Sequence, residues 1–188
     1  MPHRSRSRAP RVSRPARILL AVLALPATAA AQASGSRPST VVSAPERGAP
    51  HRTPDESAVE AALRALFAAA ERQDLGALDT LYAGDSLTVV EGTGINRGWV
   101  DYRDHHLAPE LAEMRGFRYR PFAIEPRVHG DLAWVLFRYA LQGEAQGQAI
   151  DNVGRGTAIL ERRASRWIVR HTQTTSRARR PGDPPLPQ

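Results

Sequence analysis

The sequence predicts an α+β domain in which about three N-terminal helices pack on one face of a curved, mostly antiparallel sheet. Two observations carry this prediction. Apolar residues recur at helical spacing early in residues 53–176, and four later segments are long, rich in aromatic and β-branched residues, and joined by hairpin-length turns. Helices followed by a run of strands are typical of α+β folds. With 188 residues, the chain has room for one such core and flanking segments.

The first helix is expected to begin at residues 53–56, which read Thr-Pro-Asp-Glu. Threonine is a favoured cap, proline suits the first helical position, and glutamate completes a capping box. The helix should extend to about Arg72. Its apolar stripe consists of Val59, Leu63, Leu66, Phe67 and Ala70.

Two shorter helices are expected after it. Asp74 can cap a helix that ends at residues 83–84, which read Ala-Gly. The third is expected from Trp99 to His106, and Pro109 either interrupts it or starts a second helical piece.

One strand is expected between the second and third helices, at residues 86–91. Its alternation places Glu91 on the same face as Leu87 and Val89. The four long strands are expected at residues 117–128, 131–143, 148–163 and 166–176. Short turns between them indicate an antiparallel meander. The segment 131–143 is apolar on both faces, so it is either covered on both sides within the monomer or partly buried against a second copy, and we infer a homodimer.

The net charge of +7 is concentrated at the ends of the chain. Six arginines lie in the first 17 residues, whereas residues 55–176 hold 14 arginines against 17 acidic residues. The folded part therefore lacks the basic surface that nucleic acids require. The chain has no cysteine, which excludes disulfides, cysteine-ligated metal sites, a thiol nucleophile and lipid attachment through cysteine.

The N-terminal residues 1–33 have the pattern of a secretory signal peptide. Six arginines precede the apolar run at residues 18–25, and small residues follow it, with cleavage expected near Ala31 to Ala33. The run is too short for a stable membrane anchor. The mature protein is therefore expected to be periplasmic or secreted.

Three regions are expected to follow the signal peptide. Residues 34–52, rich in Ser, Pro, Gly and Arg, are typical of a disordered linker. The folded domain is expected at residues 53–176, and residues 177–188 form an Arg- and Pro-rich disordered tail.

The order of elements and several short motifs resemble the nuclear transport factor 2-like superfamily, specifically its SnoaL-like and ketosteroid-isomerase-like exported domains. The resemblance covers nearly all of residues 55–176 and rests on Glu71-Arg72-Gln73-Asp74-Leu75, Leu81-Tyr82-Ala83-Gly84-Asp85, Gly98-Trp99, Gly130-Asp131-Leu132-Ala133-Trp134 and Arg166-Trp167-Ile168-Val169-Arg170-His171. It implies a cone-shaped fold with a pocket between the concave sheet face and the helices. This fold hosts isomerases, dehydratases, epoxide hydrolases and non-catalytic binders, so it does not decide function.

Glu91 is the first candidate catalytic residue. It lies within about a residue of the position where the resemblance implies a carboxylate base, whereas an ordinary role for it is a solvated glutamate at a strand end. Ketosteroid isomerisation also needs a second, neutral carboxylic acid. The matching strand reads Val-Gly-Arg-Gly-Thr at residues 153–157, without a carboxylate. This departure argues against steroid-type isomerisation.

His106 and His171 are the other candidates for acid–base chemistry. His106 shares a helix face with Trp99 and Tyr102, and His171 has the strand phase of Trp167. A histidine, a carboxylate and a tyrosine can perform dehydration or hydrolysis. Each histidine can equally be a hydrogen-bonded structural residue.

The pocket is expected to take a small, partly apolar molecule. Its expected lining residues are Tyr82, Trp99, Tyr102, Phe137, Arg155 and Trp167. Arg155 directed inward would favour an acidic ligand by bidentate pairing, whereas outward solvation or a salt bridge to a neighbouring strand is the more common arrangement. No cofactor is expected, and no metal, because the histidines lack ligand spacing and distant residues would have to converge. The sequence therefore favours an exported ligand-binding domain acting as a cofactor-free isomerase, lyase or hydrolase, or alternatively a non-catalytic binding or dimerisation module.

Overall fold

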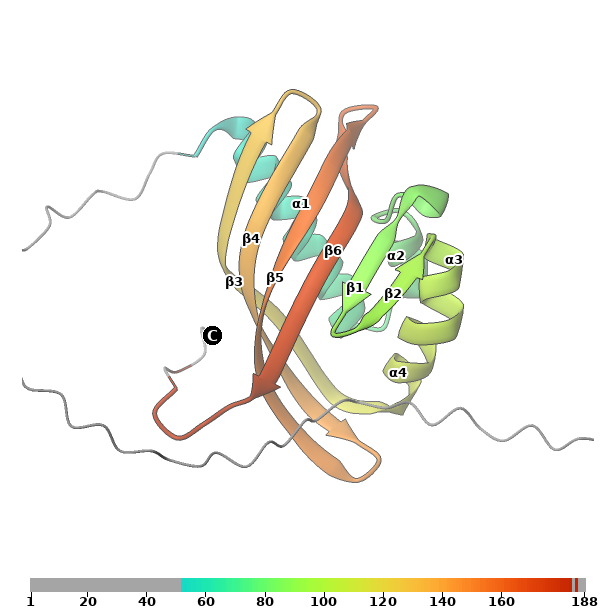
Figure 1. Cartoon of the computed structure of the whole chain (residues 1–188), viewed down its shortest axis with the longest axis vertical. Coiled ribbons are helices and arrows are strands. Elements are labelled where there is room, and N and C mark those ends of the chain that lie inside the picture. The colour runs from blue at the N-terminus through green and yellow to red at the C-terminus, as the bar shows by residue number, and fades with distance from the viewer. Residues whose placement is uncertain (1–51, 184, 186–188) are drawn as a thin grey trace, which may run out of the picture. The chain divides into compact units, whose positions relative to one another are not determined.

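The computed structural model describes residues 52–183 and residue 185 (Figure 1). Four short or medium helices and a six-stranded sheet make up the domain. The elements in chain order are α1 (Pro54–Glu71), α2 (Leu75–Asp79), the helical turn η1 (Gly84–Ser86), β1 (Thr88–Glu91), β2 (Gly94–Arg97), α3 (Trp99–Tyr102), the π-helical segment η2 (Arg103–Leu107), α4 (Ala108–Glu113), β3 (Met114–His129), β4 (Leu132–Ala145), β5 (Gln148–Arg163) and β6 (Arg166–Ala178).

Helix α1 begins at the expected cap. The hydroxyl of Thr53 accepts the backbone N–H of Glu56, and the Glu56 side chain accepts the backbone N–H of Thr53. This capping box satisfies backbone donors that a helix start leaves free. The apolar stripe of α1 is buried, with Phe67 and Leu63 at its centre, and it packs across the curved sheet (Figure 1).

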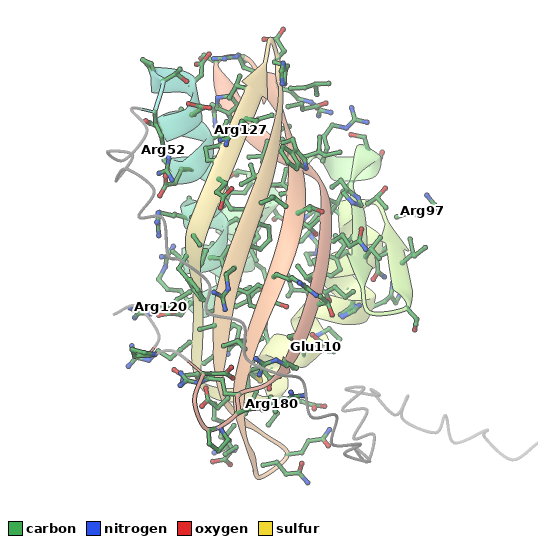
Figure 2. All side chains as sticks on the ribbon, turned by 60° about the vertical axis from the view of Figure 1, so that its left-hand side comes forward. Arg52, Arg97, Glu110, Arg120, Arg127 and Arg180 are labelled. Carbon is green, nitrogen blue, oxygen red and sulfur yellow. The ribbon has the colours of Figure 1, made fainter. Side chains whose placement is uncertain are left out.

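The sheet has the strand order β2-β1-β6-β5-β4-β3. Strands β3 to β6 form the expected antiparallel meander, so the α+β class with helices on a curved sheet is confirmed. Strand β1 adds to the sheet by running parallel to β6. Arginines stand on both edge strands, Arg120 and Arg127 on β3 and Arg97 on β2 (Figure 2). Charged side chains at edges oppose pairing with another sheet.

Strand β2 is an element that the sequence pattern did not predict. The sequence pattern predicts no strand between residue 91 and Trp99, but Gly94–Arg97 pair antiparallel with β1. Four residues, mostly exposed and starting with glycine, carry too little hydrophobic alternation to be recognised as a strand. The hairpin places Asn96 opposite Val89.

The two faces of the sheet have different environments. The inner face, which packs against α1, includes Val135, Phe137 and Tyr139 of β4, all buried. The outer face carries the intervening residues of β4. On β4 and β5 the exposed large apolar side chains of this face are Leu132, Trp134, Leu136 and Ile159, and we call this group the outer strip.

A β-bulge changes the phase of β6. Leu160 pairs with Val169, but the preceding residue Ile159 pairs with His171, so Arg170 is the extra residue. A bulge of this kind shifts every later side chain to the opposite face. Val169 therefore faces inward, whereas His171 lies on the outer face with Ile159.

The structure describes only part of the two ends of the chain. The expected signal peptide at residues 1–33, with its cleavage site, and all of the expected linker except Arg52 lie outside the described residues. Strand β6 continues to Ala178, two residues past the expected domain boundary, and Arg177 then pairs with Asp183 through two contacts of 2.7 Å. Among residues 52–183 and 185, no helix is long and apolar enough to cross a membrane.

Candidate functional site

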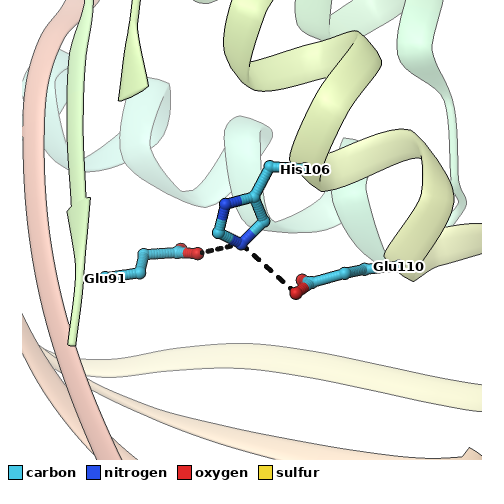
Figure 3. Close-up of side chains that lie close together, drawn as sticks. All are labelled: Glu91, His106 and Glu110. Atoms are coloured by element: carbon cyan, nitrogen blue, oxygen red, sulfur yellow. Dashed lines mark ion pairs between the residues drawn. The ribbon is translucent and has the colours of Figure 1, made fainter. Parts of the chain in front are cut away.

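Three ionisable side chains from separate elements meet beside the end of β1 (Figure 3). The Nε2 atom of His106 lies 3.0 Å from Oε2 of Glu91 and 3.2 Å from Oε1 of Glu110. The exposed fractions of the three side chains are 30% for Glu91, 25% for His106 and 33% for Glu110. The cluster is thus partly shielded from water and partly exposed to it.

The local fold explains why these residues converge. Glu91 ends β1 on the inner face, as the alternation with Leu87 and Val89 predicts. His106 lies in η2, and Glu110 follows four residues later in α4. Residues four apart lie on neighbouring positions of a helical surface, so both side chains reach toward β1.

The imidazole ring of His106 is also held from its other side. Its Nδ1 atom lies 3.0 Å from Oδ1 of Asn96 in β2. The amide nitrogen of Asn96 donates to Asp101 at 3.1 Å, which directs the amide oxygen toward His106. Because an amide oxygen only accepts, Nδ1 carries a hydrogen and Nε2 is the nitrogen that faces the two carboxylates.

The two carboxylates favour a positively charged His106. Hydrogen bonds to Glu110 and Glu91 raise the pKa of His106 to about 10, against the opposing effect of partial burial. At neutral pH the ring therefore holds a proton on Nε2 between the carboxylates. A proton in that position can be donated to a bound molecule.

Aromatic residues enclose the inner side of Glu91. The hydroxyl of Tyr102 donates to Oε1 of Glu91 at 3.3 Å. Tyr82 stacks on Trp99 with ring centroids 4.7 Å apart, and both rings are buried next to Tyr102. Burial, with a further contribution from the charge of Glu91, raises the pKa of Tyr102 well above its usual range. The phenol therefore remains a neutral hydrogen-bond donor.

Tyr139 is a site residue that the sequence analysis did not single out. Burial raises its pKa, opposed by hydrogen bonds with the hydroxyls of Thr174 and Ser176, and Thr174 pairs with Glu91 in the sheet. Its ring lies over Gly154, where a Cβ atom would come within 2.2 Å of the ring. The glycines of β5 thus make room for aromatic rings at the place where a second carboxylate was sought.

Arg155 and His171 do not lie where the sequence pattern places them. His171 is on the outer face because of the bulge at Arg170. Arg155 pairs with Arg138 on the same outer face, beside an open hollow of about 420 Å³. Neither side chain therefore joins Glu91 and His106 on the inner face.

Phe137 and Trp167 are core residues in this structure. Phe137 packs edge-on against Phe67 with ring centroids 5.5 Å apart. Trp167 lies near the start of β6, where the guanidinium of Arg162 is 4.4 Å from its ring centroid. Of the expected lining residues, the structure brings Tyr82, Trp99 and Tyr102 next to the cluster.

The sequence analysis also missed Glu110 and Asn96. Glu110 had a detectable signal, because it lies four residues after His106 on a helical segment. Asn96 had none, because its strand was not predicted. Together with Glu91 and His106, Glu110 supplies donor atoms that lie within 4.8 Å of one another, a separation that a metal ion could bridge.

Comparison with known proteins places the chain in a family. A family model described as a SnoaL-like domain matches residues 59–175. The chain belongs to the SnoaL-like family. A comparison of the SnoaL-like chain with curated proteins finds no match.

Solved structures share the fold of this SnoaL-like domain. A proposed ketosteroid isomerase from Shewanella frigidimarina is 24% identical, with a TM-score of 0.58 over 64% of this chain and 96% of that chain. A nuclear transport factor 2-like protein from Salmonella enterica serovar Typhimurium is 13% identical, with a TM-score of 0.60 over 70% and 96%. A hexachlorocyclohexane dehydrochlorinase from Novosphingobium barchaimii is 15% identical, with a TM-score of 0.58 over 71% and 95%. These similarities establish the nuclear transport factor 2-like fold and no specific activity.

Proposed function

We propose that this SnoaL-like domain binds a small, partly apolar molecule beside Glu91 and His106 and isomerises it, eliminates a group from it or hydrolyses it by acid–base chemistry. The observation that carries the proposal is the 3.0 Å contact between Nε2 of His106 and Oε2 of Glu91, made across two elements on the inner face. Buried aromatic rings beside the contact suit an apolar part of the ligand.

Glu91 and His106 can divide the proton transfers between them. Glu91 accepts a proton from the substrate, or from the attacking water in a hydrolysis, and the imidazolium of His106 donates one to the leaving group or to the carbonyl oxygen. After product release, the proton on Glu91 passes directly to Nε2 of His106 across their contact. The cycle then closes without another acid or base.

Elimination or hydrolysis fits the site better than steroid isomerisation. The neutral carboxylic acid that assists the latter reaction has no counterpart on β5, where Gly154 and Gly156 lie under the rings of Tyr139 and Phe137. Tyr102 supplies one neutral donor, but it is directed at Glu91. We therefore place the chemistry at the pair of Glu91 and His106.

Native mass spectrometry of the mature protein, purified from its own host, tests this function first. A co-purifying small molecule gives the ligand class, and the released ligand is then incubated with wild type, Glu91→Gln and His106→Gln. We expect turnover to fall by about 10²- to 10⁴-fold in both variants. The exposed Glu113→Gln variant is the control, and turnover that is equal in all four proteins would refute the catalytic roles.

A non-catalytic association module is the second candidate function, and the outer strip favours it. Trp134 remains 47% exposed and Leu132 53% exposed on the sheet. We propose that a second copy covers this strip in a homodimer. Two results together would support association as its function. The protein would be a dimer without bound ligand, and it would not turn over hydroxylated or halogenated small molecules.

We also propose that the protein is exported and that its signal peptide is cleaved near Ala31 to Ala33. The support is the order of arginines, apolar run and small residues at positions 1–33. The intact mass of the protein from its host tests this. A species that begins at Gln32 or Ser34 in the periplasm or medium is expected, and a full-length cytoplasmic species would refute export.

A further inference from the structure

The donor atoms of Glu91, His106 and Glu110 lie close enough together to surround one cation, all within 4.8 Å of one another. Divalent zinc lies about 2.0–2.2 Å from imidazole nitrogen and carboxylate oxygen, so neighbouring ligand atoms of a tetrahedral site are about 3.3–3.6 Å apart. The two contacts of Nε2, at 3.0 Å and 3.2 Å, are a few tenths of an ångström shorter, so small side-chain shifts would admit the ion. We propose that these three residues form a binding site for a divalent transition-metal cation of the Zn²⁺ type.

The tautomer of His106 is set for this role by residues outside the cluster. Asn96 accepts from Nδ1 and is itself fixed through its donation to Asp101, so a neutral ring presents its lone pair at Nε2. Histidines that bind metals usually donate their second ring N–H to such a partner. The polar support on β2 and α3 thus points the free nitrogen at the two carboxylates.

Glu91 is supported in the same way. The hydroxyl of Tyr102 donates to Oε1 of Glu91, whereas Oε2 faces His106. One oxygen is therefore oriented by a buried tyrosine, and the other is available to a cation. Supporting hydrogen bonds of this kind orient ligands in metal sites.

The charge and the access also suit a divalent cation. Two carboxylates and a neutral imidazole carry two negative charges, which a divalent cation neutralises. The side chains are one quarter to one third exposed, so an ion can enter from solvent. Three protein ligands leave a coordination position for water or another small ligand, as in catalytic zinc sites.

A cation and a proton compete for the same atom, Nε2 of His106. A cation takes the Nε2 lone pair that a proton otherwise takes, so the acid–base chemistry proposed above belongs to the cation-free protein. The cation site is inferred from the positions of its three ligands and requires no catalytic activity. Binding and turnover can therefore be tested separately.

Calorimetric titration of the metal-free full chain with Zn²⁺ alone tests the proposal. We expect one high-affinity ion per chain, and at least a tenfold loss of affinity in both His106→Gln and Glu110→Gln. His129→Gln replaces an exposed histidine at the end of β3, is the matched control, and should bind as wild type does. Circular dichroism in chelator confirms that each variant is folded.

The outcomes separate the two proposals. If the wild type binds no Zn²⁺ with high affinity, the cation site is overturned. It is also overturned if folded His106→Gln and Glu110→Gln bind Zn²⁺ with unchanged affinity. Both conclusions are independent of the turnover that is measured. If Zn²⁺ binds as expected but turnover in chelator is unaffected by His106→Gln, the cation site stands and the catalytic proposal fails.

Discussion

Oδ1 of Asn96 lies 3.0 Å from Nδ1 of His106, and this contact decides which nitrogen of the ring faces the carboxylates. The donation from Asn96 to Asp101 prevents the amide from presenting its nitrogen instead. A residue of the edge hairpin therefore controls the chemistry of a residue in η2.

Replacement of Asn96 by alanine should weaken Zn²⁺ binding without removing a ligand. The ring would lose its orientation, and changes at such supporting partners typically reduce metal affinity by about 10- to 100-fold. Calorimetry on the metal-free chain measures the effect. Ile95→Ala is the matched control, because Ile95 neighbours Asn96 on β2 and is exposed on the other face. Equal affinity in both variants would show that Asn96 does not hold the ring.

Gly154→Ala should destabilise the protein and disturb the inner face. A Cβ atom at Gly154 would lie 2.2 Å from Cζ of Tyr139, so the ring must move. Overpacking of this kind raises the free energy of the folded state by about 1–3 kcal/mol. Denaturant unfolding measures the change.

Gly76→Ala is the control for that variant. Its Cβ would meet only Asp74 Oδ1, at 3.7 Å, and it lies in α2, where alanine is preferred to glycine by about 0.5–1 kcal/mol. We therefore expect Gly76→Ala to be neutral or stabilising. A neutral Gly154→Ala would mean that Tyr139 can move without loss, against the tight packing seen here.

The sequence was sufficient to predict the structure where local patterns are regular. The capping box at Thr53 predicted the start of α1, and the strand alternation predicted that Glu91 shares the face of Leu87 and Val89, which is the inner face of the sheet. The helical spacing from Tyr102 to His106 predicted that both lie near one another, and their rings are 5.3 Å apart. In each case the relevant contact is close in sequence or follows a constant period.

The same reasoning did not predict the structure where the alternation along a strand is interrupted or where a contact joins distant strands. Val169 and His171 have the same parity in the sequence, but the bulge at Arg170 sends them to opposite faces. The contribution of Asn96 depends on a hairpin with little hydrophobic pattern, and the place of Tyr139 depends on glycines in another strand. A bulge and contacts between distant strands have no signal in local periodicity.

Trp134→Glu should convert the proposed homodimer into a monomer. The side chain stands in the outer strip, so a charge there would have to be buried unpaired in the dimer. The monomer itself should lose little stability, because the side chain is already half exposed. Light scattering after size-exclusion chromatography gives the mass. Val100→Glu on α3, where the residue is 55% exposed, is the control and should leave the mass unchanged; a wild-type monomer would refute the interface.

Glu161 should make stability depend on pH in acid. Its side chain is only 13% exposed, and its carboxylate accepts from Nη1 of Arg170 at 2.7 Å, with Arg163 as a second partner. Burial raises the pKa of Glu161, but Arg170 and Arg163 outweigh this effect and hold it below the usual value. A charge-assisted hydrogen bond of this kind contributes about 1.5–3 kcal/mol.

The sign of the pH dependence follows from the lowered pKa. The folded state binds the proton more weakly than the unfolded state, so the contribution is complete above the unfolded pKa of about 4.3 and is lost as pH falls through the folded value. Glu161→Gln should therefore be less stable than wild type at pH 7, and this difference should shrink in acid. Urea unfolding across the acidic range measures both proteins, with the exposed Glu144→Gln as control. A difference that stays constant down to the acid unfolding of the wild type would mean that the paired arginines do not stabilise the charged form of Glu161.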